Sequence, residues 1–298
     1  MSETVWRSRW AKTGGFRTHY TEAGGDGPVL LQLHGGGYGQ SGLAANHTII
    51  PMLAPHFRVL APDSVGGYGQ TDLVPTPNGI HARVDQLEDL VDALCLDRFT
   101  IMGNSQGAWT AARYAILHPD QIEAIVLVGS GSISMAMGLE RIRMQGTELA
   151  ESHGKRGTPD DMRQRIRAII HREEMITDEV VDMRLRVALR PGVQEANQAF
   201  QEGTERIQTD PLLRITYDLT VTLPWVTKLI PTIFIWGEAD HFASPRYGKQ
   251  LEKLLPHVPF HWISNAGHQA QSDQPELVGN IILKFLQTVH ENKGDRTR

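Results

Sequence analysis

Short apolar runs that alternate with helical patterns constrain the fold of this chain more than any other feature. The apolar runs end abruptly in glycine or polar residues, as strands buried on both faces of a parallel sheet do, at residues 29–33, 58–61, 99–102, 124–128, 232–236 and 260–263. Helical patterns lie between them, over residues 84–94, 108–117, 247–255 and 275–289. This alternation predicts an α/β fold with a mostly parallel central sheet flanked by helices.

The alternation stops between residues 131 and 226, where no convincing strand occurs. Amphipathic patterns there predict helices over residues 137–152, 159–172, 177–189 and 193–202. Thr158 before Pro159 resembles the capped first turn of a helix, and Pro191 with Gly192 ends the third of these helices. We therefore expect an α/β core of residues 1–130 and 227–298, and a helical lid of residues 131–226 over the carboxyl edge of the sheet.

Composition excludes several classes of function. The 34 acidic and 29 basic side chains give a formal charge of −5, which is too mild to indicate a nucleic-acid or anionic-membrane partner. Cys95 is the one cysteine, so it has no companion for an intrachain disulfide or a zinc cluster. No apolar run reaches the length of a signal peptide or a membrane span. We expect a cytoplasmic protein whose partner is a small molecule.

The strongest local motif is Gly103, Asn104, Ser105, Gln106, Gly107, which lies between a buried-strand pattern and a helical pattern. A nucleophile elbow has this G-x-S-x-G spacing and context, because the sharp turn exposes the serine hydroxyl and the flanking glycines let neighbouring backbone pass. The alternative is an ordinary glycine-flanked turn with a capping serine. The flanking patterns favour the elbow, and hence Ser105 as a nucleophile.

A second glycine-rich motif follows the strand at residues 29–33: His34, Gly35, Gly36, Gly37. Bare backbone at this place suits an oxyanion hole, formed by the amides of Gly36 and of Gln106, the residue after the nucleophile. A phosphate-binding loop is the alternative. Neither the G-x-G-x-x-G fingerprint nor the lysine of a P-loop follows, so nucleotide binding is not expected.

A serine nucleophile needs a histidine base and an acid that orients it. Asp240 follows the strand at residues 232–236, and His268 lies in a glycine-flanked loop after the last strand. Ser105, Asp240 and His268 thus occur in the chain order of an α/β-hydrolase triad. Glu238 is the rival acid, although it lies nearer the strand. Neither H-E-x-x-H nor a pair of cysteines occurs, and we expect no metal and no cofactor.

These motifs resemble the α/β-hydrolase superfamily over residues 18–289 and, within it, the meta-cleavage-product hydrolases. Those enzymes hydrolyse a carbon–carbon bond in 2-hydroxy-6-oxohexa-2,4-dienoates, the products of extradiol ring cleavage. The similar stretches are the triple glycine after His34, the elbow with Asn104, the loop at residues 63–72 and residues 236–242. The resemblance implies an α/β-hydrolase fold, a cofactor-free reaction and, in many members, a homodimer.

The resemblance also implies a set of substrate-binding residues. Arg184, in the stretch 176–184 that is similar to the family's lid helix, would hold the substrate carboxylate, a role that suits a guanidinium better than a lysine. The alternative is an exposed arginine on a helix surface. Asn46 and Asn104 match the polar pocket near the dienoate, and Phe242 matches an aromatic side chain that lines the pocket.

The chain departs from the family pattern at two places next to the expected triad. Gln106 stands where methionine is common, and Gln269 stands where tryptophan is common. The amide of Gln106 can still stabilise an oxyanion, because that role needs only backbone. Both glutamines make the expected pocket more polar, with Gln269 as a further residue near the substrate.

The sequence thus predicts a serine-triad hydrolase that cleaves a carbon–carbon bond in a vinylogous 1,5-diketone from aromatic catabolism. A carboxylesterase or lactonase with the same triad is the first alternative. A ligand receptor on the same fold is the second, since a fold does not fix function. An intact Ser105, Asp240 and His268 set argues against a pure receptor.

Overall fold

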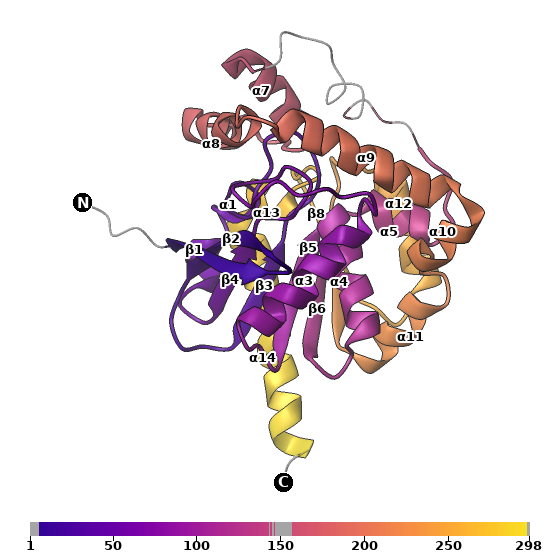
Figure 1. Cartoon of the computed structure of the whole chain (residues 1–298). Coiled ribbons are helices and arrows are strands. Elements are labelled where there is room, and N and C mark those ends of the chain that lie inside the picture. The colour runs from indigo at the N-terminus through magenta and orange to yellow at the C-terminus, as the bar shows by residue number, and fades with distance from the viewer. Residues whose placement is uncertain (1–5, 143, 145, 147–156, 297–298) are drawn as a thin grey trace.

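A twisted sheet of eight strands forms the centre of the computed structural model, which describes residues 6–142, 144, 146 and 157–296 (Figure 1). The strand order is β1-β2-β4-β3-β5-β6-β7-β8. β1, β2 and β4 pair antiparallel, and all pairs from β4 to β8 are parallel. The bounds are β1 Trp6–Thr13, β2 Phe16–Ala23, β3 Val29–Leu33, β4 Arg58–Pro62, β5 Phe99–Asn104, β6 Ile122–Val128, β7 Thr232–Gly237 and β8 Phe260–Ile263. The predicted α/β fold and its parallel strands are confirmed.

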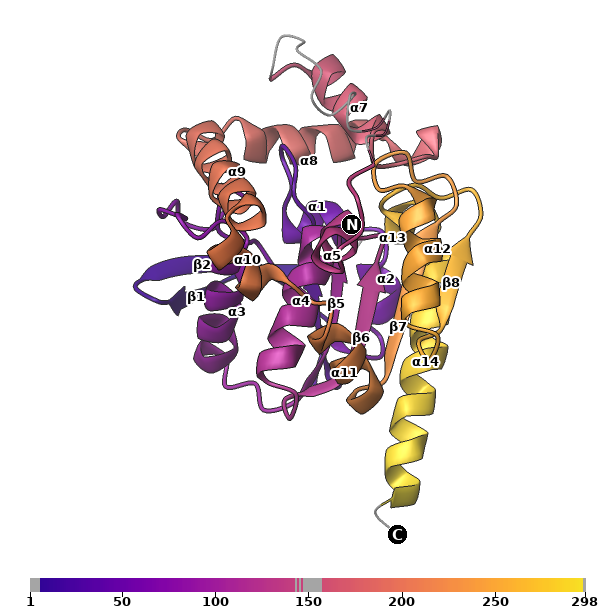
Figure 2. The ribbon, with the colours of Figure 1, turned by 90° about the vertical axis from the view of Figure 1, so that its right-hand side faces the viewer.

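Helices cover both faces of this sheet (Figures 1 and 2). Side chains of α3, α4, α5, α11 and α12 pack against one face, and those of α2 and α14 against the other. The helices are α1 Gly42–Asn46, α2 Ile50–Leu53, α3 His81–Ala93, α4 Gln106–Leu117, α5 Gly131–Ala136, α7 Pro159–Arg167, the 3₁₀ turn Glu173–Met175, α8 Asp178–Ala188, α9 Val193–Thr209, α10 Pro211–Tyr217, α11 Thr222–Leu229, α12 Pro245–Leu254, α13 Ala270–Asp273 and α14 Pro275–Arg296.

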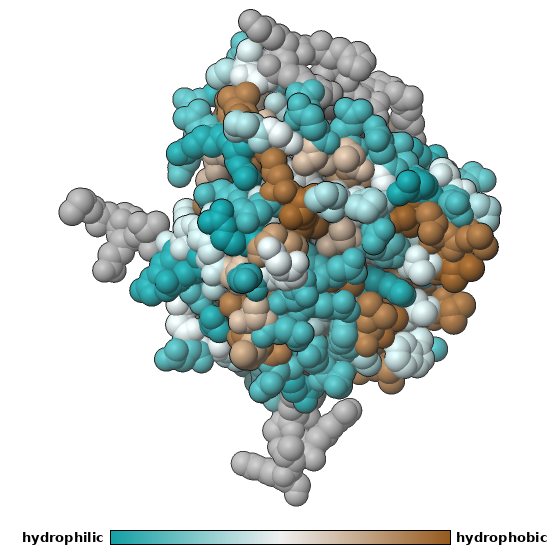
Figure 3. Space-filling model, in the orientation of Figure 1, coloured by the Kyte–Doolittle hydropathy of each residue, from teal (hydrophilic) through white to brown (hydrophobic). Residues whose placement is uncertain are grey.

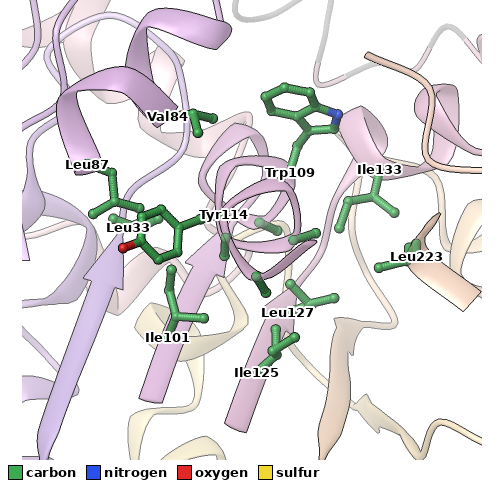
Figure 4. Packing of buried hydrophobic residues seen from close by; sticks show 14 of the residues in the cluster. Leu33, Val84, Leu87, Ile101, Trp109, Tyr114, Ile125, Leu127, Ile133 and Leu223 are labelled. Carbon is green, nitrogen blue, oxygen red and sulfur yellow. The ribbon is translucent and has the colours of Figure 1, made fainter. Parts of the chain in front are cut away.

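Two apolar cores result from the alternation of side chains along the buried strands. Successive residues of a strand point to opposite faces, so Leu31 of β3 packs in the α3 and α4 core while Leu30 packs in the α14 core. Figure 4 shows the first core, in which strand residues such as Leu33 and Ile101 lie against α4. Trp109 of α4 is fully buried there. The parallel strands are therefore apolar on both faces, which is why the sequence shows them as continuous apolar runs.

The N-terminal hairpin of β1 and β2 is an element that the sequence patterns did not predict. Four successive residues of β1 are exposed, because the strand lies at the sheet edge, and so it carries no apolar run. Gly14 and Gly15 connect the strands, and both have positive φ, at 52° and 95°. A pair of glycines with positive φ is typical of tight hairpin turns, and this pair was the available sign of the hairpin.

Helices follow β6 until β7 begins, and α7, α8 and α9 lie above the carboxyl ends of the strands (Figure 1). The helix predicted at 159–172 ends at Arg167, and that predicted at 193–202 continues to Thr209. Thr158 caps α7 by accepting a hydrogen bond from the Asp161 amide, as expected. Residues 137–142 of the predicted helix 137–152 are not helical, and most of its remainder lies outside the described residues. α10 and α11 were not expected.

The strand order places two loops side by side at one point of the sheet edge. β3 lies between β4 and β5, so the chain leaves the carboxyl end of β3 toward one side and the carboxyl end of β5 toward the other. A crevice forms at such a switch point in open α/β sheets, and ligands bind there. The glycine-rich loop after β3 and the Ser105 turn after β5 flank this crevice.

Exposed apolar side chains gather on α10 and α11, and they give a brown area on the surface in Figure 3. They include Leu212, Ile215, Trp225 and Leu229, and Val221 immediately before α11. An apolar area of this kind is more typical of an interaction surface than of a free one. Within the described part of the chain, no helix combines the length and apolarity needed to cross a bilayer.

Candidate active site

Ser105 occupies the sharp turn between β5, which ends at Asn104, and α4, which begins at Gln106. Its φ of 56° and ψ of −119° lie outside the regions that side chains other than glycine normally adopt. Such strain is typical of positions where the surrounding structure serves a function. The Ser105 amide donates to Val128 O at 3.0 Å, which fixes the turn to β6. The structure therefore has the elbow that the motif predicts, with Ser105 facing a cavity.

Both flanking glycines of the elbow are required by close backbone contacts. A Cβ on Gly103 would lie 2.2 Å from Gly107 O, and a Cβ on Gly107 would lie 2.4 Å from Leu33 O. Because these neighbours are main-chain atoms, a methyl group cannot be accommodated by a rotamer change. The G-x-S-x-G spacing is therefore a consequence of packing α4 tightly against β3 and β5.

We expect Gly103→Ala to lower the free energy of unfolding by roughly 3 kcal/mol, because the added methyl group overlaps the Gly107 carbonyl. Urea denaturation followed by circular dichroism measures the change. Gly25→Ala is the matched control, since no atom lies within 4 Å of its added Cβ, and we expect a change of less than about 0.5 kcal/mol. Equal stabilities of Gly103→Ala and the unmodified protein would contradict the requirement for glycine.

His268 and Asp240 form a buried pair behind the elbow. His268 Nδ1 lies 2.9 Å from Asp240 Oδ2, and both side chains are at most 4% exposed. Asp240 Oδ1 accepts hydrogen bonds from the amides of Phe242 and Ala243, so the carboxylate is fixed in orientation. Since a carboxylate only accepts, His268 donates from Nδ1 and its Nε2 is free to take a proton. Glu238, the rival acid, is exposed.

The His268 loop is attached to the elbow by Asn104. Its side-chain amide donates to His268 O at 3.0 Å and to Val128 O at 3.2 Å. His268 and Ser105 both line the cavity, and His268 Nε2 has no hydrogen-bond partner among the described residues. The Asn104 Oδ1 atom is buried and also without a partner there. Asn104 therefore has its donors committed to structure and its acceptor available to a ligand.

The glycine-rich loop after β3 passes directly over the elbow. A Cβ on Gly35 would lie 3.0 Å from Ser105 Cβ, and a Cβ on Gly36 would lie 2.5 Å from Gln106 Oε1. Within the described chain, the amides of Gly36 and Gln106 donate to no acceptor. Two free amide donors beside a serine are the components of an oxyanion hole.

A cavity of about 310 Å³ brings most of the predicted site residues together. The predicted residues in its wall are Gly36, Asn104, Ser105, Gln106, Arg184, Phe242 and His268. The Phe242 ring packs against the His268 ring at a centroid distance of 4.9 Å. Asn46 is not among the lining residues of the described chain: its side chain donates to Gly42 O within α1. The structure thus gives Asn46 a helix-internal contact rather than a place in the cavity.

Arg184 of α8 is a buried cation in the cavity wall. Its side chain is 2% exposed, it donates from Nη2 to Gln269 Oε1 at 3.0 Å, and no carboxylate among the described residues pairs with it. Burial lowers the pKa of Arg184 to about 10, so the guanidinium stays charged at neutral pH. A buried charge without a counter-ion is costly, and its Nε also lacks a partner in the described chain. Arg184 is therefore suited to bind an anion.

Gln269, predicted to contact the substrate, instead accepts a hydrogen bond from Arg184 outside the cavity wall. It is 1% exposed and is absent from the lining residues in the described chain, while its amide oxygen accepts from Arg184. The side chain of tryptophan, which is common at this place in the family, carries a donor and no acceptor oxygen, so it could not accept this bond. Gln269, where the chain departs from the family pattern, thus orients the Arg184 guanidinium.

One face of α9 contributes cavity residues that the sequence patterns did not single out. Gln201, Thr204, Glu205 and Gln208 recur at helical spacing and all line the cavity. Polar residues at this period are normally interpreted as a solvated face, so only the packing of α9 over the sheet shows their place. Gln201 and Gln208 donate to tyrosine hydroxyls, of Tyr68 and Tyr217 respectively.

Comparison with known proteins identifies the family. A family model described as alpha/beta hydrolase fold matches residues 28–275, and the chain belongs to this family. It is 27% identical over 270 residues to a 2-hydroxy-6-oxononadienedioate/2-hydroxy-6-oxononatrienedioate hydrolase of Pseudomonas putida, covering 90% of this chain and 91% of the relative. It is 28% identical to a 2-hydroxy-6-oxo-2,4-heptadienoate hydrolase of Pseudomonas putida, covering 93% and 95%.

A solved structure supports the same relationship. A serine hydrolase involved in carbazole degradation, the CarC enzyme, is 25% identical and superposes with a TM-score of 0.75, over 95% of this chain and 99% of the other. The predicted superfamily and the resemblance to meta-cleavage-product hydrolases are confirmed.

Proposed function

We propose that this member of the α/β-hydrolase fold family hydrolyses a carbon–carbon bond in 2-hydroxy-6-oxohexa-2,4-dienoates during the breakdown of aromatic compounds. The observation that carries this proposal is Arg184, a buried cation without a carboxylate partner in the described chain that shares a cavity with Ser105 and His268. A general esterase has no need of an anion-binding group beside its nucleophile. The relatives named for dienoate substrates support the same substrate class.

The reaction requires a proton transfer before the bond breaks. Arg184 holds the substrate carboxylate and the free Oδ1 of Asn104 accepts a hydrogen bond from the dienol end. His268, kept in its Nδ1-protonated tautomer by Asp240, moves the enol proton so that the dienol becomes a ketone. The ketone makes the bond to C6 susceptible to hydrolysis, because the departing carbon now leaves as a stabilised dienolate.

Cleavage then follows the general chemistry of a serine triad. Ser105, or a water activated by His268, adds to the C6 carbonyl, and the amides of Gly36 and Gln106 stabilise the oxyanion. Collapse of this adduct breaks the carbon–carbon bond and releases a 2-hydroxydienoate and a carboxylic acid. Each step uses a group that lines the cavity or orients one that does.

The polar face of α9 bears on the substituent at C6. Gln201, Thr204, Glu205 and Gln208 give the cavity a wall that can hydrogen-bond, and Arg141 adds a charged group. Such a wall suits a C6 substituent with polar groups better than an unsubstituted phenyl ring. This inference is compatible with the dioate substrate in the name of one relative.

Esters and lactones remain the second candidate substrates, because the elbow, the Asp240–His268 pair and the amide donors would act on them equally. An acidic ester would also satisfy Arg184. The cytoplasmic location remains a prediction, and so does the homodimer, for which the apolar face of α10 and α11 is the candidate surface.

We expect Arg184→Met to weaken dienoate binding by about 10- to 100-fold, because a charged hydrogen bond to the carboxylate is lost. Stopped-flow absorbance in a Ser105→Ala background measures the dissociation constant without turnover. Arg184→Lys, which keeps the charge but loses the planar fork, should bind with intermediate affinity. Methionine fills the buried site without leaving an unpaired charge, so the fold is expected to persist.

Arg186→Met is the matched control for this experiment. Arg186 lies on the same helix, is exposed and donates to Asp182 O in the preceding turn. In the Ser105→Ala background, we expect the dissociation constant of Arg186→Met to equal that of Ser105→Ala alone. Equal losses for Arg184→Met and Arg186→Met, or no loss for either, would exclude Arg184 as the carboxylate-binding residue.

A further inference from the structure

Arg83 of α3 is a buried cation that the proposed reaction does not use. It is 2% exposed and lies behind the glycine-rich loop, away from the main cavity. Its Nη1 donates to His34 O at 3.0 Å and its Nη2 donates to Gly35 O at 3.3 Å. Arg83 therefore donates hydrogen bonds to two successive carbonyls of the loop that passes over Ser105.

No carboxylate among the described residues pairs with Arg83. Its guanidinium instead lies over two aromatic rings, 4.6 Å from the centroid of Tyr68 and 5.1 Å from that of Phe200. Burial lowers the pKa of Arg83, which reflects the cost of keeping its charge away from water. A buried ion held by neutral groups is expensive, so the loop carbonyls and the rings must supply its stabilisation.

The geometry of the peptide unit connects the hydrogen bonds of Arg83 to the oxyanion site. In a planar trans peptide, the carbonyl of Gly35 and the N–H of Gly36 point in opposite directions. Ser64 N donates to His34 Nε2 at 3.0 Å, so His34 carries its proton on Nδ1 and donates to Gly35 O at 2.6 Å. Two donors thus hold the carbonyl on the far side, and the Gly36 N–H faces away from them.

The contacts of Arg83 also reach the helices above the sheet. Phe200 belongs to α9, is fully buried and meets the Tyr68 ring edge-on at 5.7 Å. Gln201, the next residue, lines the cavity and donates to the Tyr68 hydroxyl at 3.3 Å. One connected set of contacts therefore joins the ligand-facing side of α9 to the carbonyl side of the glycine-rich loop.

We propose that Arg83 is a positioning residue for the oxyanion hole: its guanidinium fixes and polarises the Gly35–Gly36 peptide so that the Gly36 amide is directed at the developing negative charge. The cation on the carbonyl side withdraws electron density and strengthens the amide as a donor. Tyr68 and Phe200 hold the guanidinium in place. Because Phe200 belongs to α9, the direction of the Gly36 amide depends on how α9 packs over the sheet. The inference rests on the proposed use of Ser105 as a nucleophile, although not on the identity of the substrate.

Turnover and affinity for a tetrahedral mimic test this role together. We expect Arg83→Met to lower kcat for p-nitrophenyl acetate and to weaken inhibition by phenylboronic acid by a common factor of about 10 to 100, less than the loss of a whole oxyanion donor. The dissociation constant of the dienoate in a Ser105→Ala background should change by less than about twofold, since ground-state binding does not use the oxyanion amides. Arg83→Lys, which restores the charge, should recover part of both losses.

Val91→Ala is the matched control for a general loss of packing. Val91 lies on the same helix, is 1% exposed and packs in the core between α3 and α4 through apolar contacts. We expect it to lower the melting temperature while leaving kcat and the boronate inhibition constant unchanged.

Three results would overturn the proposal. They are an unchanged boronate inhibition constant in Arg83→Met, an equal loss in Val91→Ala, and, should Arg83→Met not fold, full activity and boronate affinity in Arg83→Gln, which lacks the charge. Parallel losses of esterase activity and boronate affinity in a protein that leaves dienoates intact would support the role of Arg83 and refute the dienoate substrate instead.

Discussion

Replacing Ser105 with alanine lowers kcat for the dienoate by roughly 10⁴- to 10⁶-fold, while the protein still binds the substrate. The strained elbow positions Ser105 by its backbone contacts, so removal of the hydroxyl leaves the cavity and Arg184 intact. The chromophore of the dienoate reports both events in a stopped-flow trace. A rapid shift of the spectrum without subsequent bleaching is the expected result.

Ser8→Ala is the control for this experiment. Ser8 belongs to a second set of a serine, a histidine and an aspartate that are joined by hydrogen bonds, as a catalytic triad is. Ser8 Oγ lies 2.7 Å from His19 Nε2, and His19 Nδ1 lies 2.7 Å from Asp63 Oδ2. Ser8 and His19 lie in β1 and β2, Asp63 follows β4, and none of the three lines the cavity in the described chain. We expect Ser8→Ala to retain full kcat. A large loss in Ser8→Ala, or full activity in Ser105→Ala, would refute the assignment of the nucleophile.

Replacing Asp240 with asparagine lowers kcat by roughly 10⁴-fold, because it forces His268 into the wrong tautomer. Asp240 Oδ1 accepts from two backbone amides, so the asparagine oxygen takes that position and its NH₂ group replaces Oδ2. His268 Nδ1 must then accept, and its proton moves to Nε2, where the base is required. Stopped-flow bleaching of the dienoate measures the loss, and circular dichroism verifies that the fold is retained.

Glu238→Gln is the matched control for the acid. Glu238 comes two residues earlier, is exposed, and has no hydrogen bond to His268 in the described structure. We expect its kcat to equal that of the unmodified protein. A larger loss of kcat in Glu238→Gln than in Asp240→Asn would contradict this assignment. It would mean that His268 pairs with Glu238 during the reaction.

Strands that are buried on both faces could be predicted from the sequence, whereas the exposed elements β1 and α10 could not. β3 lies at its predicted bounds, because an interior parallel strand needs an uninterrupted apolar run. The edge strand β8 also lies at its predicted bounds, since three of its four residues are apolar. β1 was missed because most of its solvent-facing residues are polar or charged, and only the Gly14–Gly15 turn indicated it. α10 was missed for a related reason: its apolar residues Leu212 and Ile215 are exposed, so no core-facing stripe marks it.

Of the site residues, those that belong to local sequence motifs could be predicted, whereas those that act through contacts distant in the sequence could not. The Ser105 elbow and the acid and base loops are encoded by motifs that follow strands, so they could be predicted by position. Arg83 could not, because its role depends on two carbonyls 48 and 49 residues away. The side chain of Asn46 donates to Gly42 O within α1, a contact that its position near the glycine-rich loop in sequence does not indicate.

Product analysis after reaction with 2-hydroxy-6-oxohepta-2,4-dienoate in ¹⁸O-labelled water distinguishes carbon–carbon hydrolysis from ester hydrolysis. Absorbance follows the bleaching of the dienoate, and mass spectrometry identifies the products, with p-nitrophenyl acetate as the ester control. We predict rapid bleaching that yields 2-hydroxypenta-2,4-dienoate and acetate labelled with ¹⁸O, since water supplies one carboxylate oxygen. Cleavage of the ester with the dienoate left intact would contradict carbon–carbon hydrolysis and leave an esterase or lactonase.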